Sequence, residues 1–484
     1  MLSSEELICR SVYDYFEARI LMDRYHTGDR LPSIMDIAKA FQLAPGTVRA
    51  ALLMLAGDGY IHMEAKRVSV VVYNAKQKER ESNTARHYAQ RYEGVLDLLQ
   101  SGTYLMQPML AYGLRRMDDD CWARLQEKWG QPPGEQIVPS SIQFYAQVFA
   151  SLDSTLILNL YWEIDRYIRF SYLCDWDVYQ TLSPALNIKD REEAAVQIES
   201  SLQTAIGETS RTLLNVCNQA RTRYQAEEQI PLRWTVYRQR RQLCYTLVAR
   251  IIRKIASGIY PVGSFLPALP RMAEQLEVSL STLRRTLSIL GSLGVVRSYH
   301  GKGTLVCMEV GNIDFSRNEI RDGMLYYWES LQFLAITART VTLYMLQNIS
   351  EGDRAEFTTQ FIRMCELERC HRCFDITLAF IVERCPLMLV RECYGKLQEF
   401  LAWGYPFTLN RLRSHNLQSE YAGAIQRAAD FLEQQDWEGF ALEFEALMFR
   451  EEKFAKSVLA DSCGWKSGYT DKKDIMAEEG VEIK

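Results

Sequence analysis

The chain has 484 residues, and its 48% hydrophobic and 24% charged residues are typical of a folded protein with several domains, not of a disordered or fibrous one. The formal net charge of −5 does not by itself favour a nucleic-acid partner, and the sequence has no apolar run of about 18 residues, which argues against a membrane protein. The N-terminus lacks a basic and apolar leader and the 12 cysteines are scattered, so we expect a protein of the reducing cytoplasm.

The first part of the chain predicts three helices and a β-ribbon. Apolar residues at helical spacing predict a helix over residues 5–24, and a capping pattern predicts a short second helix over 33–41. The turn residues at 44–46 break the chain, and the spacing then predicts a third helix over 47–58. The alternating, β-branched segment 60–73 predicts a two-stranded ribbon. This order of elements is typical of a winged helix-turn-helix.

The same pattern recurs 235 residues further along the chain. Gly28 is matched by Gly263, and Thr47-Val48-Arg49 is matched by Thr282-Leu283-Arg284, with no gap between these positions. A shared offset over about 35 residues indicates an internal duplication. The segments that follow the two copies also resemble each other faintly, so we expect a two-domain unit repeated as A-B-A′-B′.

The third helix of each copy is the element that fits the major groove of DNA. Arg49 and Arg284 lie one turn into that helix and face away from its apolar stripe, where a guanidinium can reach base edges. Thr47 and Thr282 lie at its start, where a hydroxyl and free backbone N–H groups can meet phosphate. These positions predict a double-stranded DNA partner.

At these residues the sequence resembles the GntR family of bacterial transcription regulators, whose pattern includes G-x-R-L-P-S before the second helix and G-x-G-T in the wing. The first copy keeps the former segment but has Ala44 in place of a serine and lacks the wing glycines. The second copy keeps Ser279 and the wing segment 301–304 but has Phe265 and Ala268 where the family has arginine and serine. The residues that we assign to the DNA interface are Arg30, Ser33, Thr47, Arg49, Ser279, Thr282, Arg284, Arg285, Gly301, Lys302 and Gly303.

The two copies differ in their net charge. Residues 232–310 carry twelve Lys and Arg against three acids, whereas residues 1–80 carry eleven against ten. A basic domain within an acidic protein is the electrostatic signature of a duplex binder. We therefore expect the second copy to be the main phosphate anchor, and a role in protein contacts alone stays open for the first copy.

Residues 84–228 and 313–457 have the pattern of one helix after another, without the strand-turn-helix motifs of common enzyme classes, so we expect no enzyme. Beside a GntR-like segment they resemble the FadR-type (FCD-like) helical effector domain, which implies a small carboxylate or acyl effector and a tendency to dimerise. The positions that this resemblance assigns to the effector are Gln107, Tyr145, Gln332, His371 and Asp375. The later histidines of the family's metal site are absent, so we expect no metal and no cofactor.

Two other groups of residues leave alternatives open. Cys365, Cys370, His371 and Cys373 form a cluster that fits either helical thiols or a redox or metal sensor. The aromatic residues of the bundle helices, Tyr161 among them, fit either core packing or a ligand pocket. The polar tail 466–484 predicts disorder.

The sequence thus predicts a mainly α-helical cytoplasmic regulator with domains at 1–80, 84–228, 232–310 and 313–457. It would act on a DNA operator as a single-chain pseudo-dimer, and a small-molecule effector would control it. Because the two copies differ, we expect an asymmetric operator. An interaction or scaffold protein without DNA readout is the alternative, and further dimerisation of the chain stays open.

Overall fold

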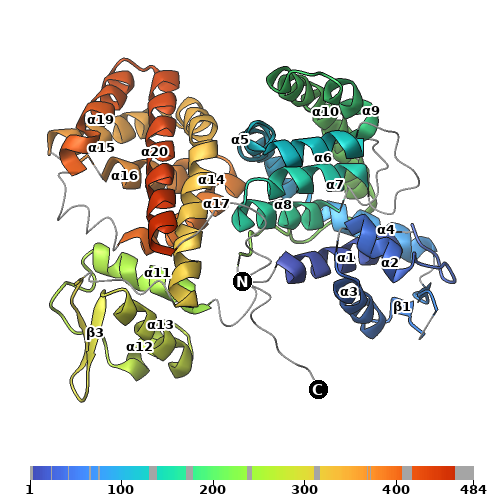
Figure 1. Cartoon of the computed structure of the whole chain (residues 1–484), viewed down its shortest axis with the longest axis horizontal. Coiled ribbons are helices and arrows are strands. Elements are labelled where there is room, and N and C mark those ends of the chain that lie inside the picture. Colours follow the sequence, from blue (N-terminus) through green and yellow to red (C-terminus); the bar gives the residue numbers. More distant parts are fainter. Residues whose placement is uncertain are drawn as a thin grey trace. The chain divides into compact units, whose positions relative to one another are not determined.

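The computed structural model describes residues 4–22, 24–41, 43–64, 67–74, 77–129, 139–169, 178–236, 243–309, 317–367, 369–370, 372–405 and 417–463. The chain divides into two compact units, one from Leu2 to Val236 and the other from Tyr237 to Lys484. Each unit holds a small winged helix, which we call its head, followed by a bundle of helices (Figure 1). The architecture is therefore mainly α-helical and repeated, as the sequence predicts.

The first head consists of α1 (Ser4–Leu21), α2 (Ile34–Phe41), α3 (Pro45–Gly57), β1 (Ile61–His62) and β2 (Val70–Val71). The apolar faces of its three helices form the core, in which Val12, Phe16 and Leu52 are fully buried. The expected break at 44–46 is wrong for Pro45 and Gly46, which form the first turn of α3. Proline is tolerated there because the N–H groups of a first turn have no partner within the helix.

The second head consists of α11 (Leu243–Ala256), α12 (Leu269–Gln275), α13 (Leu280–Ser292), β3 (Val296–Tyr299) and β4 (Gly303–Val306). Its backbone hydrogen bonds repeat those of the first head at the same offset. The Gly28 N–H donates to the Val71 carbonyl, and the Gly263 N–H donates to the Val306 carbonyl, both at 2.8 Å. The isolated β-bridge that joins the segment before the second helix to the wing also recurs. The duplication therefore extends to the backbone pairing.

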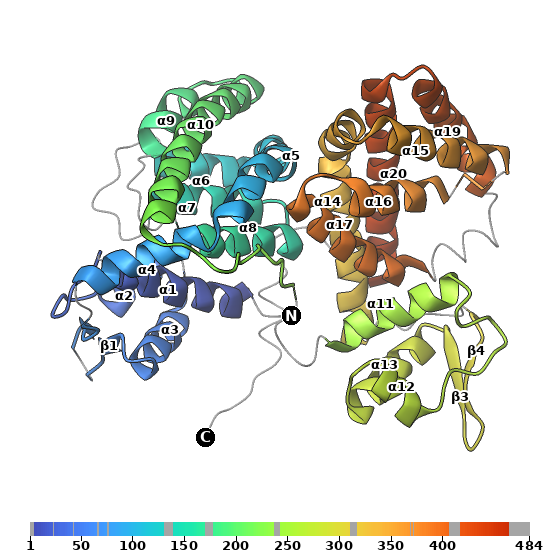
Figure 2. The ribbon, with the colours of Figure 1, turned by 180° about the vertical axis from the view of Figure 1, so that it is seen from behind.

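The first bundle consists of α4 (Gln77–Ala89), α5 (Tyr92–Arg116), α6 (Asp119–Trp129), α7 (Ser140–Ala150), α8 (Thr155–Ile168), α9 (Val178–Leu186) and α10 (Arg191–Arg223). Helix α4 packs along α10, and the segment after α10 runs back along the bundle (Figure 2). Trp234 is buried there, and its indole N–H donates to Asn159 Oδ1 at 2.8 Å. The expected start of the second head at residue 232 thus falls on a segment that packs against the first bundle.

The second bundle consists of α14 (Asn318–Asn348), α15 (Glu351–Glu366), α16 (Arg372–Arg384), α17 (Met388–Leu401), the 3-10 helix η2 (Ala402–Gly404), α19 (Leu417–Glu433) and α20 (Trp437–Cys463). Helix α14 packs along α20 (Figure 1). The buried Trp328 indole on α14 donates to Glu452 Oε1 on α20 at 2.7 Å. Tyr161 in the first bundle and Tyr326 in the second are also buried, so these aromatic residues pack in the cores.

Within the described ranges, no single helix is long and apolar enough to cross a membrane, although the bent pair α2 and α3 passes that test jointly by length and composition. The tail 466–484 and His371, both named in the sequence analysis, lie outside the described residues.

Candidate nucleic-acid interface

The N-terminus of α13 in the second head presents a group of hydroxyls. Ser279 precedes the helix in an extended conformation, and its Oγ accepts a hydrogen bond from the Thr282 N–H at 3.1 Å. The Ser279 hydroxyl also lies 2.9 Å from Ser281 Oγ and 2.7 Å from Thr282 Oγ1. Because the dipole and the free N–H groups of a helix N-terminus favour an anion, this turn is suited to a phosphate group.

Arg284 lies further along α13, and its side chain is exposed. Together with Ser288 it lines one wall of a cavity of about 450 Å³, and Arg297, Ser298 and Thr304 of the wing line the opposite wall. Leu269, Leu287 and Val296 also line the cavity, and Glu309 lies there as the ion-pair partner of Arg297. The cavity is therefore a groove of mixed apolar and polar lining, into which α13 brings Arg284. Such a groove between recognition helix and wing can accommodate a strand of the DNA backbone.

Arg285, the next residue of α13, is engaged differently. Its Nη2 lies 3.1 Å from Glu319 Oε1 at the start of α14, the first helix of the second bundle. The Arg285 side chain is thus held by an ion pair with the bundle, whereas Arg284 lines the groove. Its assignment to the DNA interface stays a prediction.

The wing of the second head has the tight tip that the sequence predicts. Gly301 and Gly303 have φ values of +74° and +106°, a backbone region that residues with a side chain rarely adopt. They place Lys302 at the exposed tip between β3 and β4. On β3, Arg297 pairs with Glu309, so Lys302 supplies the exposed cation at the tip itself.

The corresponding helix of the first head, α3, has a different surface. Arg49 is exposed, but Ala44 precedes the helix without a side-chain cap. Leu53 and Met54 are 53% and 38% exposed, where the second head has the polar Ser288 and the buried Ile289. The outer face of α3 is therefore apolar beyond its single arginine.

At the start of the second helix, it is the first head that has the side-chain cap and the exposed arginine, and the second head that lacks both. Ser33 Oγ accepts the Asp36 N–H at 3.2 Å and its hydroxyl donates to Asp36 Oδ2 at 2.5 Å, which caps α2, and Arg30 is exposed nearby. The second head has an exposed Phe265 in place of the arginine and an uncapped Ala268 in place of the serine. In each head, therefore, only one of the second and third helices has a side-chain cap: α2 in the first head and α13 in the second.

The wing of the first head carries charges of both signs. Arg67 Nη1 lies 2.8 Å from Glu64 Oε2, and His62 Nε2 lies 3.4 Å from Glu64 Oε1. Arg67 occupies the position of Lys302, but it is partly neutralised by this carboxylate. In the described part of the first wing, the residue equivalent to the exposed Lys302 is thus a cation that is paired with a carboxylate.

The sequence model of the family described as bacterial regulatory proteins, gntR family, matches residues 9–72 and again residues 245–306. Both heads are GntR domains. The two matches cover the strands and most of the helices of the two winged helices, and they confirm the resemblance of both heads to the GntR family.

A curated relative of Bacillus subtilis (strain 168), named an uncharacterized HTH-type transcriptional regulator, YdfD, is 25% identical over 160 residues. The match covers 33% of this chain and 29% of that protein. Among solved structures, Escherichia coli McbR/YncC is 15% identical with a TM-score of 0.25, and the match covers 44% of this chain and 97% of that one. Streptococcus agalactiae GntR is 14% identical with a TM-score of 0.18, and the match covers 43% of this chain and 99% of that one.

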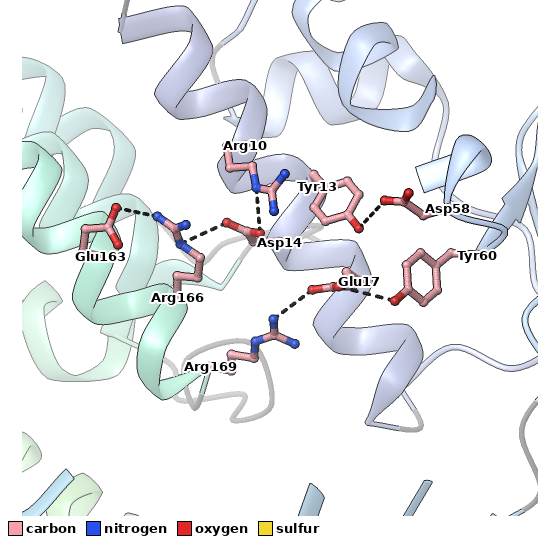
Figure 3. Close-up of polar contacts among 9 residues, drawn as sticks. All are labelled: Arg10, Tyr13, Asp14, Glu17, Asp58, Tyr60, Glu163, Arg166 and Arg169. Carbon is pink, nitrogen blue, oxygen red and sulfur yellow. Dashed lines mark hydrogen bonds and ion pairs between the residues drawn. The ribbon is translucent and has the colours of Figure 1, made fainter. Parts of the chain in front are cut away.

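The first GntR domain is joined to its bundle by ion pairs between α1 and α8 (Figure 3). The buried Asp14 lies between two arginines, with Oδ1 3.4 Å from Arg10 Nε and Oδ2 3.3 Å from Arg166 Nε. Arg166 in turn donates to Glu163 Oε1 at 2.6 Å. A domain helix and a bundle helix thus share one buried charge cluster.

The charge cluster continues toward α3 and the wing (Figure 3). Arg169, which caps the end of α8, donates to Glu17 Oε2 at 2.8 Å, and the Tyr60 hydroxyl lies 3.4 Å from Glu17 Oε1. The Tyr13 hydroxyl donates to Asp58 Oδ2 at the end of α3 at 2.7 Å. Polar contacts therefore extend from the bundle through α1 to the end of the recognition helix.

Burial changes the acidity of these groups. It raises the pKa of Glu163 to about 7, although Arg166 opposes the shift. It also raises the pKa of Asp14, against the opposing effect of Arg166 and Arg10. Burial and the neighbouring Glu17 raise the pKa of Tyr60 to about 12.

Besides the ion pair of Arg285 with Glu319, the second GntR domain meets its bundle through apolar and aromatic groups of α11. Tyr245, Ala249 and Ile252 occupy the positions of Arg10, Asp14 and Glu17. The Tyr245 ring packs 5.8 Å from the Trp403 ring, and its hydroxyl donates to Asp322 Oδ2 at 3.1 Å. Neither junction was predicted from the sequence. The available signal was the charge of residues 10, 14 and 17 on a helix whose duplicate is apolar at these places.

The residues assigned to an effector are distributed over both bundles. Gln107 on α5 is half-buried, and Tyr145 on α7 packs against Phe149 with ring centroids 6.2 Å apart. Gln332 on α14 is buried and Asp375 on α16 is exposed. Their role stays a prediction. Among the described residues, no group of three or more His, Cys, Asp or Glu side chains could hold a metal ion.

Proposed function

We propose that the protein is a transcription regulator that binds a double-stranded DNA operator through two unequal GntR domains in one chain. The observation that carries this proposal is the difference between the two domains. In the second, Ser279 caps the N-terminus of α13, Arg284 lines the groove beside the wing, and Lys302 is exposed at the wing tip. The second domain therefore anchors the phosphate backbone, and the first adds a weaker contact centred on Arg49.

The two bundles serve to control the domains. A bundle can bias DNA binding only if it contacts a GntR domain, and α8 does so through the ion pairs of Arg166 and Arg169. In the second unit, the ring contact of Tyr245 with Trp403 supplies the corresponding connection. An effector bound in either bundle would act by favouring one arrangement of its junction. The chemistry of that effector, a small carboxylate or acyl compound, is inferred from the FadR-type resemblance.

Footprinting tests this proposal. The full chain would be used to select fragments of its own genome, and the selected sites would be mapped for the wild type, Arg49→Ala and Arg284→Ala at two salt concentrations. We expect a protected site with two unequal halves, of which Arg284→Ala weakens one strongly and Arg49→Ala weakens the other mildly. Protection of one half only would overturn the pseudo-dimer, and no enrichment, with or without carboxylate effectors, would overturn the regulator.

A protein-contact role for the first GntR domain is the second candidate. The apolar outer face of α3, with Leu53 and Met54 exposed, is the observation that favours it. If this candidate holds, Leu53→Ser leaves the footprint unchanged and so does Arg49→Ala. An effect of Arg49→Ala on one half-site would refute it.

A further inference from the structure

Three cysteines lie where α15 ends and α16 begins in the second bundle, and the proposed function uses none of them. Cys365 is half-buried near the end of α15, Cys373 is fully buried in the first turn of α16, and Cys370 is buried between the two helices. None of these three forms a disulfide bond. Their position at a helix junction raises the question whether two of them form a reactive pair.

The geometry singles out Cys365 and Cys373. Both thiols point to the same acceptor, the Phe361 carbonyl oxygen, from which Cys365 Sγ lies 3.5 Å and Cys373 Sγ 3.8 Å. Two side chains from different helices thus converge on one atom. The Phe361 ring packs 5.3 Å from Phe440, so an aromatic core backs the pair on its inner side.

The two thiols also differ in acidity in a complementary way. A hydrogen bond from the Cys373 thiol lowers the pKa of Cys365, although burial and the acidic Asp430 and Glu366 oppose this shift. The same interaction, together with burial, raises the pKa of Cys373. Cys365 is therefore both the more accessible thiol and the one that more readily becomes a thiolate, which is the reactive form.

We propose that Cys365 and Cys373 form a peroxide-sensitive pair, in which Cys365 is oxidised first and Cys373 then closes a disulfide. The Cys365 thiolate attacks one oxygen of hydrogen peroxide, the O–O bond breaks, and hydroxide leaves, which yields a sulfenic acid. The Cys373 sulfur then attacks that sulfenic sulfur. The S–S bond forms, the S–O bond breaks, and water leaves with the proton of the Cys373 thiol. In total, two thiols are oxidised and one peroxide is reduced to two waters.

This inference does not rest on DNA binding, so it can hold or fail independently of the proposed function. Few thiols in a protein meet these conditions, because a redox sensor needs a low pKa, access to the oxidant and a resolving partner together. Cys121 provides a comparison within the same chain. It is also half-buried, but burial and a hydrogen bond with Asp118 raise its pKa.

The experiment is peptide mapping of the intact full-length chain after a short exposure to hydrogen peroxide, followed by alkylation of the remaining thiols and digestion with trypsin. Cleavage after Arg363, Arg369, Arg372 and Arg384 places the three cysteines on separate peptides, 364–369, 370–372 and 373–384. We expect the first and third of these to be linked, and we expect Cys365 to react about tenfold faster than Cys121 with an alkylating agent at neutral pH.

The variants complete the test. In Cys373→Ser we expect the Cys365 sulfenic acid to accumulate and to be trapped by dimedone, whereas Cys365→Ser abolishes the link and Cys121→Ser leaves it unchanged. A link to peptide 370–372, a link between two chains on a non-reducing gel, or a Cys365 that stays reduced or passes to sulfinic acid in the wild type would each overturn the pair. The wild-type map decides the matter even if a variant fails to fold.

Discussion

Two neighbouring residues of α13 make contacts with different surfaces. Arg284 and Arg285 are adjacent in sequence, yet the first lines the groove beside the wing and the second pairs with Glu319 of the bundle. The direction of a side chain on a helix, and not its charge alone, decides which of the two surfaces it serves. A sequence analysis that groups both as DNA-binding residues cannot make this distinction.

Arg284→Ala is expected to weaken specific DNA binding by about 1–3 kcal/mol, because it removes a guanidinium from the groove. Arg285→Ala is the matched control, with the same chemistry one position away and with its guanidinium engaged by Glu319. We expect it to weaken binding much less. Fluorescence anisotropy with a labelled operator at fixed salt would measure both. Equal losses for the two variants would show that Arg285 also reaches DNA.

Glu163 makes the first junction sensitive to pH. Its folded-state pKa of about 7 is higher than in the unfolded chain, so the folded state holds the proton more tightly. This stabilising contribution is complete below the unfolded pKa and is lost as the pH rises through about 7. From pH 6 to pH 8 the wild type should therefore lose about 1 kcal/mol of stability relative to Glu163→Gln, which cannot titrate. Thermal unfolding of both proteins at the two pH values checks this, and a difference independent of pH contradicts it.

At the scale of elements, the two heads keep the same helices and hydrogen bonds but differ at the starts of those helices. Helix α2 is capped by Ser33 and α12 is not capped by Ala268, whereas α13 is capped by Ser279 and α3 is not capped by Ala44. The backbone before α3 has the same extended conformation as that before α13, with φ and ψ of −64° and 139° against −68° and 150°. A serine at position 44 can therefore adopt the capping geometry without strain.

Ala44→Ser is thus expected to stabilise the first head by about 0.5–1 kcal/mol, and Ser279→Ala to destabilise the second by about 1 kcal/mol. Ala44→Ser adds one hydrogen bond from an N–H two or three residues along the helix, and Ser279→Ala removes the equivalent bond. Urea unfolding of the full chain would give the changes in free energy. Loss of stability in Ala44→Ser would mean that the N-terminus of α3 cannot be capped in this way.

At the scale of the whole molecule, the net charge of −5 conceals an uneven distribution. Residues 243–309 carry eight Lys and Arg against three acids, so the second head is basic even without the residues that precede it. Binding to DNA should therefore be steeply salt-dependent, and most of this dependence should come from the second head.

Lys302→Ala is expected to lower the slope of log affinity against log salt by about one, because one phosphate contact is lost. Arg67→Ala, at the equivalent position of the first wing, should change it by much less, since Glu64 already neutralises Arg67 in part. Affinity measured over a series of salt concentrations gives both slopes. The prediction fails if the Arg67 variant has the larger effect.

Much of this architecture could be predicted from the sequence, because the heads depend on local signals. Gly28, the 47–49 triplet and the fixed offset of 235 are enough to predict two winged helices. The start of α3 was misplaced because Pro45 breaks most helices but also begins many. The junctions were missed because they join residues such as Asp14 and Arg166, which lie 152 positions apart and therefore give no local pattern. The placement of Arg285 likewise depends on tertiary contacts with α14.

The two junctions also bear on how the duplicated halves evolve. Recombination between duplicates tends to exchange their segments and to keep them alike. Here an exchanged first head would bring Asp14 and Glu17 to a bundle that offers the Trp403 indole, and the reciprocal exchange would leave Arg166 facing Ala249. Buried charges that lose their partners cost several kcal/mol. We therefore expect such hybrids to be less stable than a chain in which each head keeps its own bundle.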